Sequence, residues 1–380
     1  MNRDRMLLGT GIAALMATTA SAENLYSAET VLTGLDRPWA MEFLPGSDQM
    51  LLTFRGGSLG LWDGESDEVT VLEGAPDVVA RGQGGLLDVA ASPEFDGSGW
   101  VYMTWVAEVD GGTTTHLGRA RLDPGAAELT DLETLHIVQP GIESDAHFGS
   151  RIVFQDDHVF VGFGDRNSKA FGPDHIAQDL SSENGSVIRL TLDGDIPDEN
   201  PFVDEEDAAA AIWSYGHRNI QAMTVHPETN EIWLAEHGEA GGDEVNIVQR
   251  GENFGWPLAS FGVTYSGGER FAEPHQEGDG FVAPIHHWPA GRDNHFPPSG
   301  MAFYTGDAFA DWQGHLLIGN LFHQYIGLFE QEDGGLTEVA RLLDGEGHRI
   351  RDIAVGPENG AIYVLTDGEN ARVIRLSPTG

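Results

Sequence analysis

The chain has 380 residues, of which 40% are hydrophobic and 9% aromatic, so it can bury a substantial core and is not a disordered chain. Acidic residues outnumber basic ones by 61 to 20, and the formal net charge of −41 disfavours binding to nucleic acid or to an anionic membrane. Cysteine is absent, which excludes disulfides, thiolate zinc sites, iron–sulfur clusters and cysteine nucleophiles.

The N-terminus has the pattern of a secretory signal peptide. Two arginines precede an apolar stretch at residues 7–16 that is too short to span a bilayer, and the small residues ending at Ala22 fit the cleavage rule. We expect residues 1–22 to be removed and residues 23–380 to form the mature protein. Export without cysteine suits a bacterial periplasm, and no later stretch is apolar enough to cross a membrane. An uncleaved membrane anchor is the alternative interpretation.

A hairpin pattern recurs six times along the mature chain. Each copy has an apolar strand, a turn rich in Pro, Asp or Gly, and a second apolar strand, and each copy has roughly 60 residues available, enough for a four-stranded blade. Helical periodicity is poor, and its best candidate, residues 204–211, is short. We predict a single all-β domain over residues 23–380, a six-bladed β-propeller with four-stranded antiparallel blades; two β-sandwiches are the competing fold. The copies begin at Trp39, Gly84, Gly149, Ile220, Ser299 and Ile350.

Polar residues stand just before the first strand or just after the second strand of several copies, where loops of a propeller converge on one mouth. In the third copy, His147 precedes the first strand and Asp165 follows the second. A neutral imidazole can act as a general base near pH 7, and a carboxylate can orient it. A histidine that only bonds a turn is the alternative.

The other copies place amides and guanidinium groups at matching positions. Arg218 and Asn219 directly precede the fourth copy, and Gln83 holds the corresponding place in the second. Arg349 and Arg351 precede the last copy, and strand alternation puts them on one face, where they could clamp an anionic ligand. For the arginines, ion pairs with the many carboxylates are the alternative.

The acidic, glycine-rich loop at residues 236–244 follows the second strand of the fourth copy. It offers main-chain and carboxylate oxygens, the ligands that Ca²⁺ prefers, although a solvated turn would have the same composition. A zinc site built from His286, His287 and His295 is a weaker candidate.

These motifs together resemble the soluble aldose sugar dehydrogenases that use pyrroloquinoline quinone (PQQ). The resemblance covers nearly the whole mature chain in the same order. It implies a six-bladed propeller with PQQ and Ca²⁺ as cofactors, an aldose sugar as substrate and an electron acceptor of unspecified identity. The segments that carry it are LDRPWAMEFLP, GQGGLLDVA, HFGSR, SYGHRN, EHGEAGGDEVN, NFGWP, PSGMAFY and RIRDIAVGP.

The resemblance also implies roles for individual residues. His147 matches the base that takes the proton of the anomeric hydroxyl while a hydride passes to the quinone, Asp165 supports that base, and Arg218 stabilises charge on the quinone oxygens. Contacts to the cofactor or substrate are implied for Gln83, Asn219, Arg349 and Arg351. The carbonyls of Gly238 and Glu239 match those that hold the quinone-bound Ca²⁺, and Glu244 and Phe254 match the site of a second, structural Ca²⁺.

Three positions depart from the family pattern. Glu239 and Ile220 stand where proline is usual, and relatives place a lysine where this chain continues with Phe322, His323 and Gln324. Because PQQ carries three carboxylates, the change removes a cation from the cofactor site, and His323 is a candidate to compensate. The missing lysine favours one alternative function, a calcium-stabilised propeller that binds a ligand or partner without redox chemistry. A metal-dependent lactonase or hydrolase is a third, disfavoured by the order of the motifs.

Overall fold

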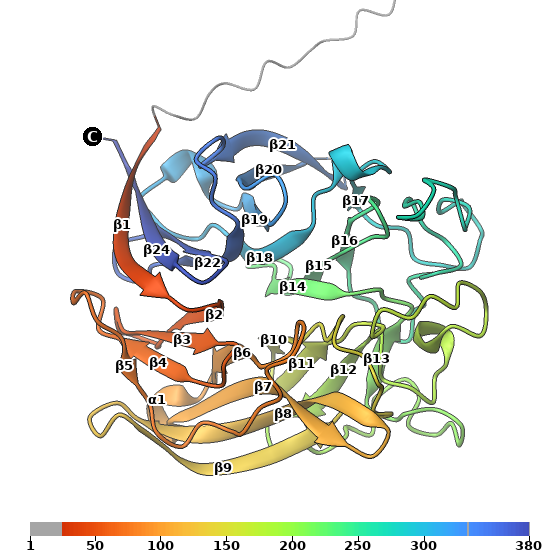
Figure 1. The fold of residues 1–380 in the computed structure, drawn as a ribbon, viewed down its shortest axis with the longest axis horizontal. Helices are drawn as coiled ribbons and strands as arrows, with labels where there is room; N and C mark the ends of the chain where they lie inside the picture. The colour runs from red at the N-terminus through yellow and green to blue at the C-terminus, as the bar shows by residue number, and fades with distance from the viewer. Residues whose placement is uncertain (1–24, 333, 380) are drawn as a thin grey trace, which may run out of the picture.

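Six four-stranded antiparallel sheets surround a central axis in the computed structural model, which describes residues 25–332 and 334–379 (Figure 1). The predicted six-bladed β-propeller is therefore confirmed. The predicted signal peptide, residues 1–22, lies outside the described residues. Within the described ranges, no helix has the length and apolar character needed to cross a membrane.

Each blade begins with its innermost strand, and the strands of the first five blades follow chain order. Blade 1 comprises β2 (Pro38–Phe43), β3 (Met50–Phe54), β4 (Leu59–Trp62) and β5 (Thr70–Val71). Blade 2 comprises β6 (Leu86–Ala91), β7 (Trp100–Val109), β8 (Gly112–Asp123) and β9 (Glu128–Ile137). Blade 3 comprises β10 (Arg151–Gln155), β11 (His158–Gly162), β12 (Ser186–Thr191) and β13 (Ile212–Tyr215).

Blade 4 comprises β14 (Ile220–Val225), β15 (Ile232–Glu236), β16 (Glu244–Ile247) and β17 (His286–His287). Blade 5 comprises β18 (Pro298–Phe303), β19 (Leu316–Asn320), β20 (Ile326–Glu332) and β21 (Gly335–Leu342). Blade 6 comprises β22 (Ile350–Val355), β23 (Ile362–Thr366), β24 (Ala371–Pro378) and the N-terminal strand β1 (Tyr26–Leu35). The helical elements are α1 (Phe95–Ser98) and the 3₁₀ turns η2 (Ile176–Gln178), η3 (Arg292–Asn294) and η4 (Ala310–Trp312).

The ring is closed by hydrogen bonds between the two ends of the domain. Strand β1 pairs antiparallel with β24, from Tyr26 opposite Pro378 to Leu35 opposite Ala371. The first strand of the chain therefore completes the last blade, and Figure 1 shows β1 and β24 side by side. This pairing covers the edge that blade 6 would otherwise expose.

The hydrophobic core is divided into six clusters, one between each pair of neighbouring blades. Between blades 1 and 2, for example, Trp39 and Leu51 pack with Leu86 and Met103. Both faces of the inner strands are buried, which explains their nearly unbroken apolar sequences. Since the core lies between blades, the axis itself is free to hold polar side chains.

A bulge at the start of the inner strand recurs in five blades. In blade 4, Ile220 pairs with Glu236 before the register shifts, and in blade 6, Ile350 pairs with Thr366 before a similar shift. A bulge bends a strand and re-aims its side chains. Residues that precede an inner strand therefore lie beside residues that follow the second strand, all at one mouth of the channel.

Residues 204–211, the predicted helix, form turns instead. Their backbone groups bond to neighbouring segments: the N–H of Ala209 donates to the Leu180 carbonyl, and the Asn200 side chain donates to the Ala210 carbonyl. These tertiary hydrogen bonds replace those within a helix, so the helix prediction was wrong.

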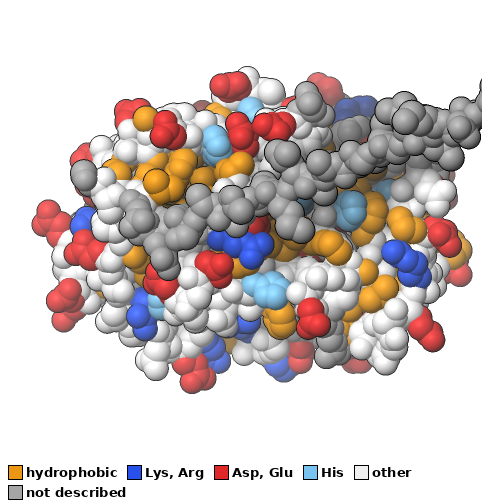
Figure 2. All heavy atoms as spheres, turned by 90° about the horizontal axis from the view of Figure 1, so that it is seen from above, with side chains coloured by type: hydrophobic (Ala, Val, Ile, Leu, Met, Phe, Trp, Pro, Cys, Tyr) orange, Lys and Arg blue, Asp and Glu red, His pale blue; other side chains and the backbone are white. Residues whose placement is uncertain are grey.

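At the surface, Figure 2 shows acidic side chains scattered over one side of the molecule rather than gathered in one patch.

Candidate active site

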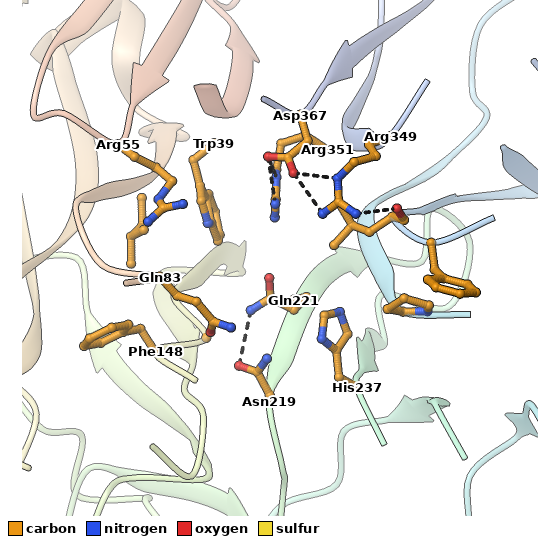
Figure 3. A pocket seen from close by; sticks show the side chains of 15 residues that line it. Trp39, Arg55, Gln83, Phe148, Asn219, Gln221, His237, Arg349, Arg351 and Asp367 are labelled. Carbon is orange, nitrogen blue, oxygen red and sulfur yellow. Dashed lines mark hydrogen bonds and ion pairs between the residues drawn. The ribbon is translucent and has the colours of Figure 1, made fainter. Parts of the chain in front are cut away.

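A cavity of about 340 Å³ opens at the mouth where the inner strands begin (Figure 3). Its volume lies in the range of small-molecule sites. All six blades contribute to it, so a ligand there would contact segments spread along the whole chain. The lining residues are Trp39, Arg55, Gln83, Leu87, Phe148, Gly149, Asn219, Gln221, His237, Pro297, Leu321, Phe322, Arg349, Arg351 and Asp367.

The cavity is positively charged, with three guanidinium groups and one carboxylate in its lining. Asp367 accepts a hydrogen bond of 3.0 Å from Arg349 and another of 3.0 Å from Arg351, which fixes both guanidinium groups. Burial alone would raise the pKa of Asp367, but the charges of Arg351 and Arg349 bring it below its ordinary value. Arg55 faces these groups from the other side of the cavity (Figure 3). In a chain of charge −41, such a lining favours an anionic ligand.

His147 and Asp165 form a buried pair beside this cavity, directly before the lining residues Phe148 and Gly149. The imidazole Nδ1 lies 2.6 Å from Asp165 Oδ1, and the second carboxylate oxygen accepts a 2.8 Å hydrogen bond from Trp256 Nε1. The main-chain N–H of His147 donates to the cavity residue Gln83 at 2.8 Å. A side chain on Gly164 would collide with the His147 carbonyl and the Asn219 amide, so this close approach requires glycine.

The protonation of this pair suits a general base. Burial is the main cause that lowers the pKa of His147, and the charge of Arg218 lowers it further, although Asp165 acts in the opposite direction. Burial raises the pKa of Asp165, but His147 and Arg218 outweigh that effect and leave it below its ordinary value. Since Asp165 is ionised, Nδ1 of His147 carries the proton of their hydrogen bond, and Nε2 holds a free lone pair.

Arg218 adjoins this pair, since its carbonyl accepts the Asp165 N–H at 2.7 Å, and its side chain is held by three partners. Its guanidinium lies 2.5 Å from Glu239 Oε2 and donates to the His237 carbonyl at 3.0 Å, and its Cζ lies 5.1 Å from the centre of the Trp256 ring. Its Nε is buried and has no hydrogen-bond partner among the described residues. Arg218 thus has one unsatisfied donor, and its side chain lines the smaller cavity described next.

A second cavity, of about 10 Å³, lies beside the acidic loop and is lined by Glu236, Gly238, Glu244 and Phe254 among others. Glu236 and Glu244 are opposite each other on β15 and β16. Burial, and then the charge of Glu236, raise the pKa of Glu244 well above its ordinary value. A buried carboxylate, Glu236, and a half-buried one, Glu244, beside a space for a single atom fit a hard divalent cation, which would offset their repulsion.

The structure brings most of the predicted site residues together. Gln83, Asn219, Arg349 and Arg351 line the cavity, and the His147–Asp165 pair lies behind that lining, bonded to Gln83. Arg218, Gly238, Glu244 and Phe254 line the smaller cavity, and Glu239 contacts Arg218.

Four predicted histidines do not join the site. His323 lines a separate depression beside Glu338 and Arg341, and Phe322 instead reaches the cavity. Among the residues that the structure describes, no group of three or more histidines and carboxylates could hold a metal ion, and this includes His286, His287 and His295.

The motif search overlooked Arg55, His237 and Asp367, although all three line the cavity. Each directly follows the second strand of its blade, after β3, β15 and β23 respectively. The same positional rule that identified Asp165 would have found them, had it been applied to every copy of the repeat.

The sequence profile of the family described as Glucose / Sorbosone dehydrogenase matches residues 35–375, almost the whole propeller. The chain belongs to this family. Aldose sugar dehydrogenase YliI of Escherichia coli (strain K12), a curated relative, is 41% identical over 358 residues, which cover 93% of each chain. The match confirms the resemblance seen in the motifs.

Solved structures agree with this membership. The apo-form crystal structure of the soluble aldose sugar dehydrogenase from Escherichia coli has a TM-score of 0.87 and 39% identity, covering 93% of this chain and 100% of that one. The PQQ-bound form of aldose sugar dehydrogenase from Streptomyces coelicolor has a TM-score of 0.74 and 25% identity, covering 93% of this chain and 98% of that one. This member of the glucose/sorbosone dehydrogenase family therefore shares its propeller with sugar dehydrogenases, one of them solved with PQQ.

Proposed function

We propose that this protein oxidises aldose sugars to lactones with PQQ bound in the arginine-lined cavity. The observation that carries the proposal is the His147–Asp165 pair beside a cavity that is lined by three guanidinium groups. A base beside a site for an anionic cofactor is what oxidation of a sugar hydroxyl by a quinone needs. The similarity to relatives named aldose sugar dehydrogenases supports the same reaction.

The residues of the cavity fit the quinone. PQQ carries three carboxylates, which Arg349, Arg351 and Arg55 would pair with, while Asn219 would face its oxygens. When bound, PQQ would supply the hydride-accepting centre of the reaction.

His147 would carry out the proton transfer. Its Nε2 takes the proton of the anomeric hydroxyl as the hydride on the same carbon leaves, so that the sugar becomes a lactone. Asp165 stabilises the imidazolium that forms and holds the ring in the productive tautomer through the 2.6 Å contact at Nδ1. Arg218 would stabilise negative charge that develops on the acceptor.

Two Ca²⁺ sites complete the proposal. The main-chain carbonyls of Gly238 and Glu239 would bind the ion that contacts the quinone; the carbonyl of Glu239 already accepts the Val263 N–H at 2.9 Å and has a second lone pair. Glu244 and the carbonyl of Phe254 would bind the structural ion in the smaller cavity. We further propose that residues 1–22 direct the protein to the periplasm and are then removed.

The test is reconstitution of the purified protein with PQQ and Ca²⁺, followed by dye reduction with glucose and other aldoses. We expect reduction that depends on both additions, and PQQ binding that quenches tryptophan fluorescence. Binding of PQQ without dye reduction on any aldose would contradict the reaction. Absence of PQQ binding would instead favour a ligand-binding propeller without redox activity, as the position of Phe322 in the cavity lining suggests.

A further inference from the structure

The chain has a single lysine, Lys169, in the loop that follows β11 and Asp165. Its Nζ lies 2.7 Å from Oε2 of Glu239, the same oxygen that Arg218 contacts at 2.5 Å. Two cations from different parts of the chain therefore share one carboxylate oxygen beside the candidate active site, and the three side chains form a charged triad. In a protein with 61 acidic residues, the only lysine is paired with this one.

Burial of two of these groups reduces the screening of their charges by solvent. The side chains of Arg218 and Glu239 are each 4% exposed, whereas the side chain of Lys169 is 48% exposed. Without Lys169, Glu239 would cancel the charge of Arg218 and leave the pair neutral. With Lys169, the three groups together keep one net positive charge beside the cavity.

We propose that Glu239 is a positioning residue that holds the Arg218 guanidinium in place, and that Lys169 restores the positive charge which Glu239 would otherwise cancel. The inference rests on the proposed function, because an anionic quinone is the ligand that this charge would serve. It assigns a role to the side chain of Glu239 and to Lys169, neither of which takes part in the proposed reaction.

His147 reports the charge of this triad, because it is close to two of its members. Arg218 and Lys169 both lower the pKa of His147, after the larger effect of burial, while Asp165 opposes them. Two other histidines lie nearby. His237, which follows β15, has a pKa lowered to about 3, chiefly by burial, and His175, 3.5 Å from Asp165, has its pKa lowered by burial as well. His237 therefore stays neutral above pH 5, and changes in the triad should be seen directly in the titration of His147.

The test is a charge cycle read by NMR titration of His147 in the apoprotein. Lys169→Met leaves the triad neutral and should raise the pKa of His147 by about half a unit. Glu239→Gln keeps an oxygen acceptor for Arg218, leaves two net positive charges and should lower that pKa by a similar amount. The double variant has the wild-type charge and should titrate near the wild type.

The same variants should change PQQ affinity, measured by fluorescence quenching. Lys169→Met should weaken binding roughly threefold, Glu239→Gln should tighten it roughly threefold, and the double variant should be close to the wild type. Glu239→Ala also removes the hydrogen-bond acceptor, so it should not increase PQQ affinity as Glu239→Gln does, because Arg218 is no longer held.

Two variants on the outer strands of blade 2 serve as controls, since Arg121→Met and Glu133→Gln make the same charge changes on half-exposed side chains. Shifts of His147 in the same direction for both triad variants, or no larger than in these controls, would overturn the proposal. If Glu239→Gln fails to fold, the direction of the His147 pKa shift in Lys169→Met alone still tests the proposal. Because the titration uses the apoprotein, failure of PQQ to bind would count against the proposed function only.

Discussion

A cavity lies at each end of the six inner strands, and the two cavities differ in how their charged side chains are paired. Where the strands begin, loop residues form the cavity lined by Arg55, Arg349 and Arg351. Where they end, a cavity of about 520 Å³ is lined mostly by apolar side chains together with Glu42, Asp88, Arg151 and Asp352. The first cavity presents cations to a ligand, whereas the charges of the second are largely paired with one another.

Arg151 and Arg351 differ in how many of their hydrogen-bond donors are used within the protein. Arg151 lies between the cavities and donates to Asp88 at 3.1 Å, to Asp352 at 2.9 Å and to the Gln221 carbonyl at 2.8 Å, so its donors are used within the protein. Arg351 bonds only to Asp367 among the described residues and faces the cavity. An arginine satisfied within the fold stabilises it, and one left partly unsatisfied at a cavity is available for binding.

The largest expected effect concerns the general base beside the arginine-lined cavity. His147→Ala should reduce sugar-dependent dye reduction about a thousandfold, because the general base is lost. The unfolding midpoint and PQQ affinity should change little, since the ring is bonded through Asp165 only. Turnover within tenfold of the wild type at saturating PQQ would refute the assignment of the base.

The next largest effect is a loss of stability on removing Arg151 from the channel axis. Arg151→Met should lower the free energy of unfolding by about 3 kcal/mol, because it leaves Asp88 and Asp352 buried without their cation. Urea denaturation measures this change. Arg121→Met, at a half-exposed position on β8, is the control and should change the same quantity by less than about 0.5 kcal/mol. Equal effects of the two variants would show that the axial network does not stabilise the fold.

A third prediction concerns pH and the far cavity. Burial, with Asp88 as the next cause, raises the pKa of Glu42 from 4.5 to about 8. The folded protein thus holds this proton to higher pH than the unfolded chain, so the contribution of Glu42 is fully present below pH 4.5 and is lost as the pH rises through 8.

Glu42→Gln cannot lose that proton and should be more stable than the wild type by about 2 kcal/mol at pH 8.5, with little difference at pH 4. Urea denaturation across this pH range is the measurement. Some decline with pH should remain in the variant, because burial also raises the pKa of Asp88 to about 6. Parallel stability curves for the two proteins would show that Glu42 ionises normally.

The smallest effect tests the cationic lining itself. Arg351→Met should weaken PQQ binding about tenfold, the loss expected for one charge-assisted hydrogen bond. Arg375→Met removes an arginine of the same blade that pairs with Glu29 at the surface, and it should leave the affinity unchanged. If both variants bind PQQ equally well, the arginine-lined cavity is not the cofactor site.

Sequence patterns were informative wherever a feature is repeated. Six hairpins predicted six blades, and the starts of the inner strands lie within two residues of the predicted copies. The positions before the first strand and after the second predicted His147 and Asp165, because an antiparallel hairpin brings the start of its first strand and the end of its second together. Residues 204–211 were mispredicted because their hydrogen bonds go to distant segments such as Leu180.

The sequence by itself determined the propeller, the family and the chemical types that gather at its mouth, since these follow from local periodicity and from motifs in a fixed order. Tertiary structure alone decided which of them meet: Phe322 rather than His323 reaches the cavity, and Lys169 shares the carboxylate of Glu239 with Arg218 across 70 and 21 positions of the chain. The physical reason is that ion pairing and burial depend on separations of a few ångströms, which blade packing sets and sequence distance does not reveal.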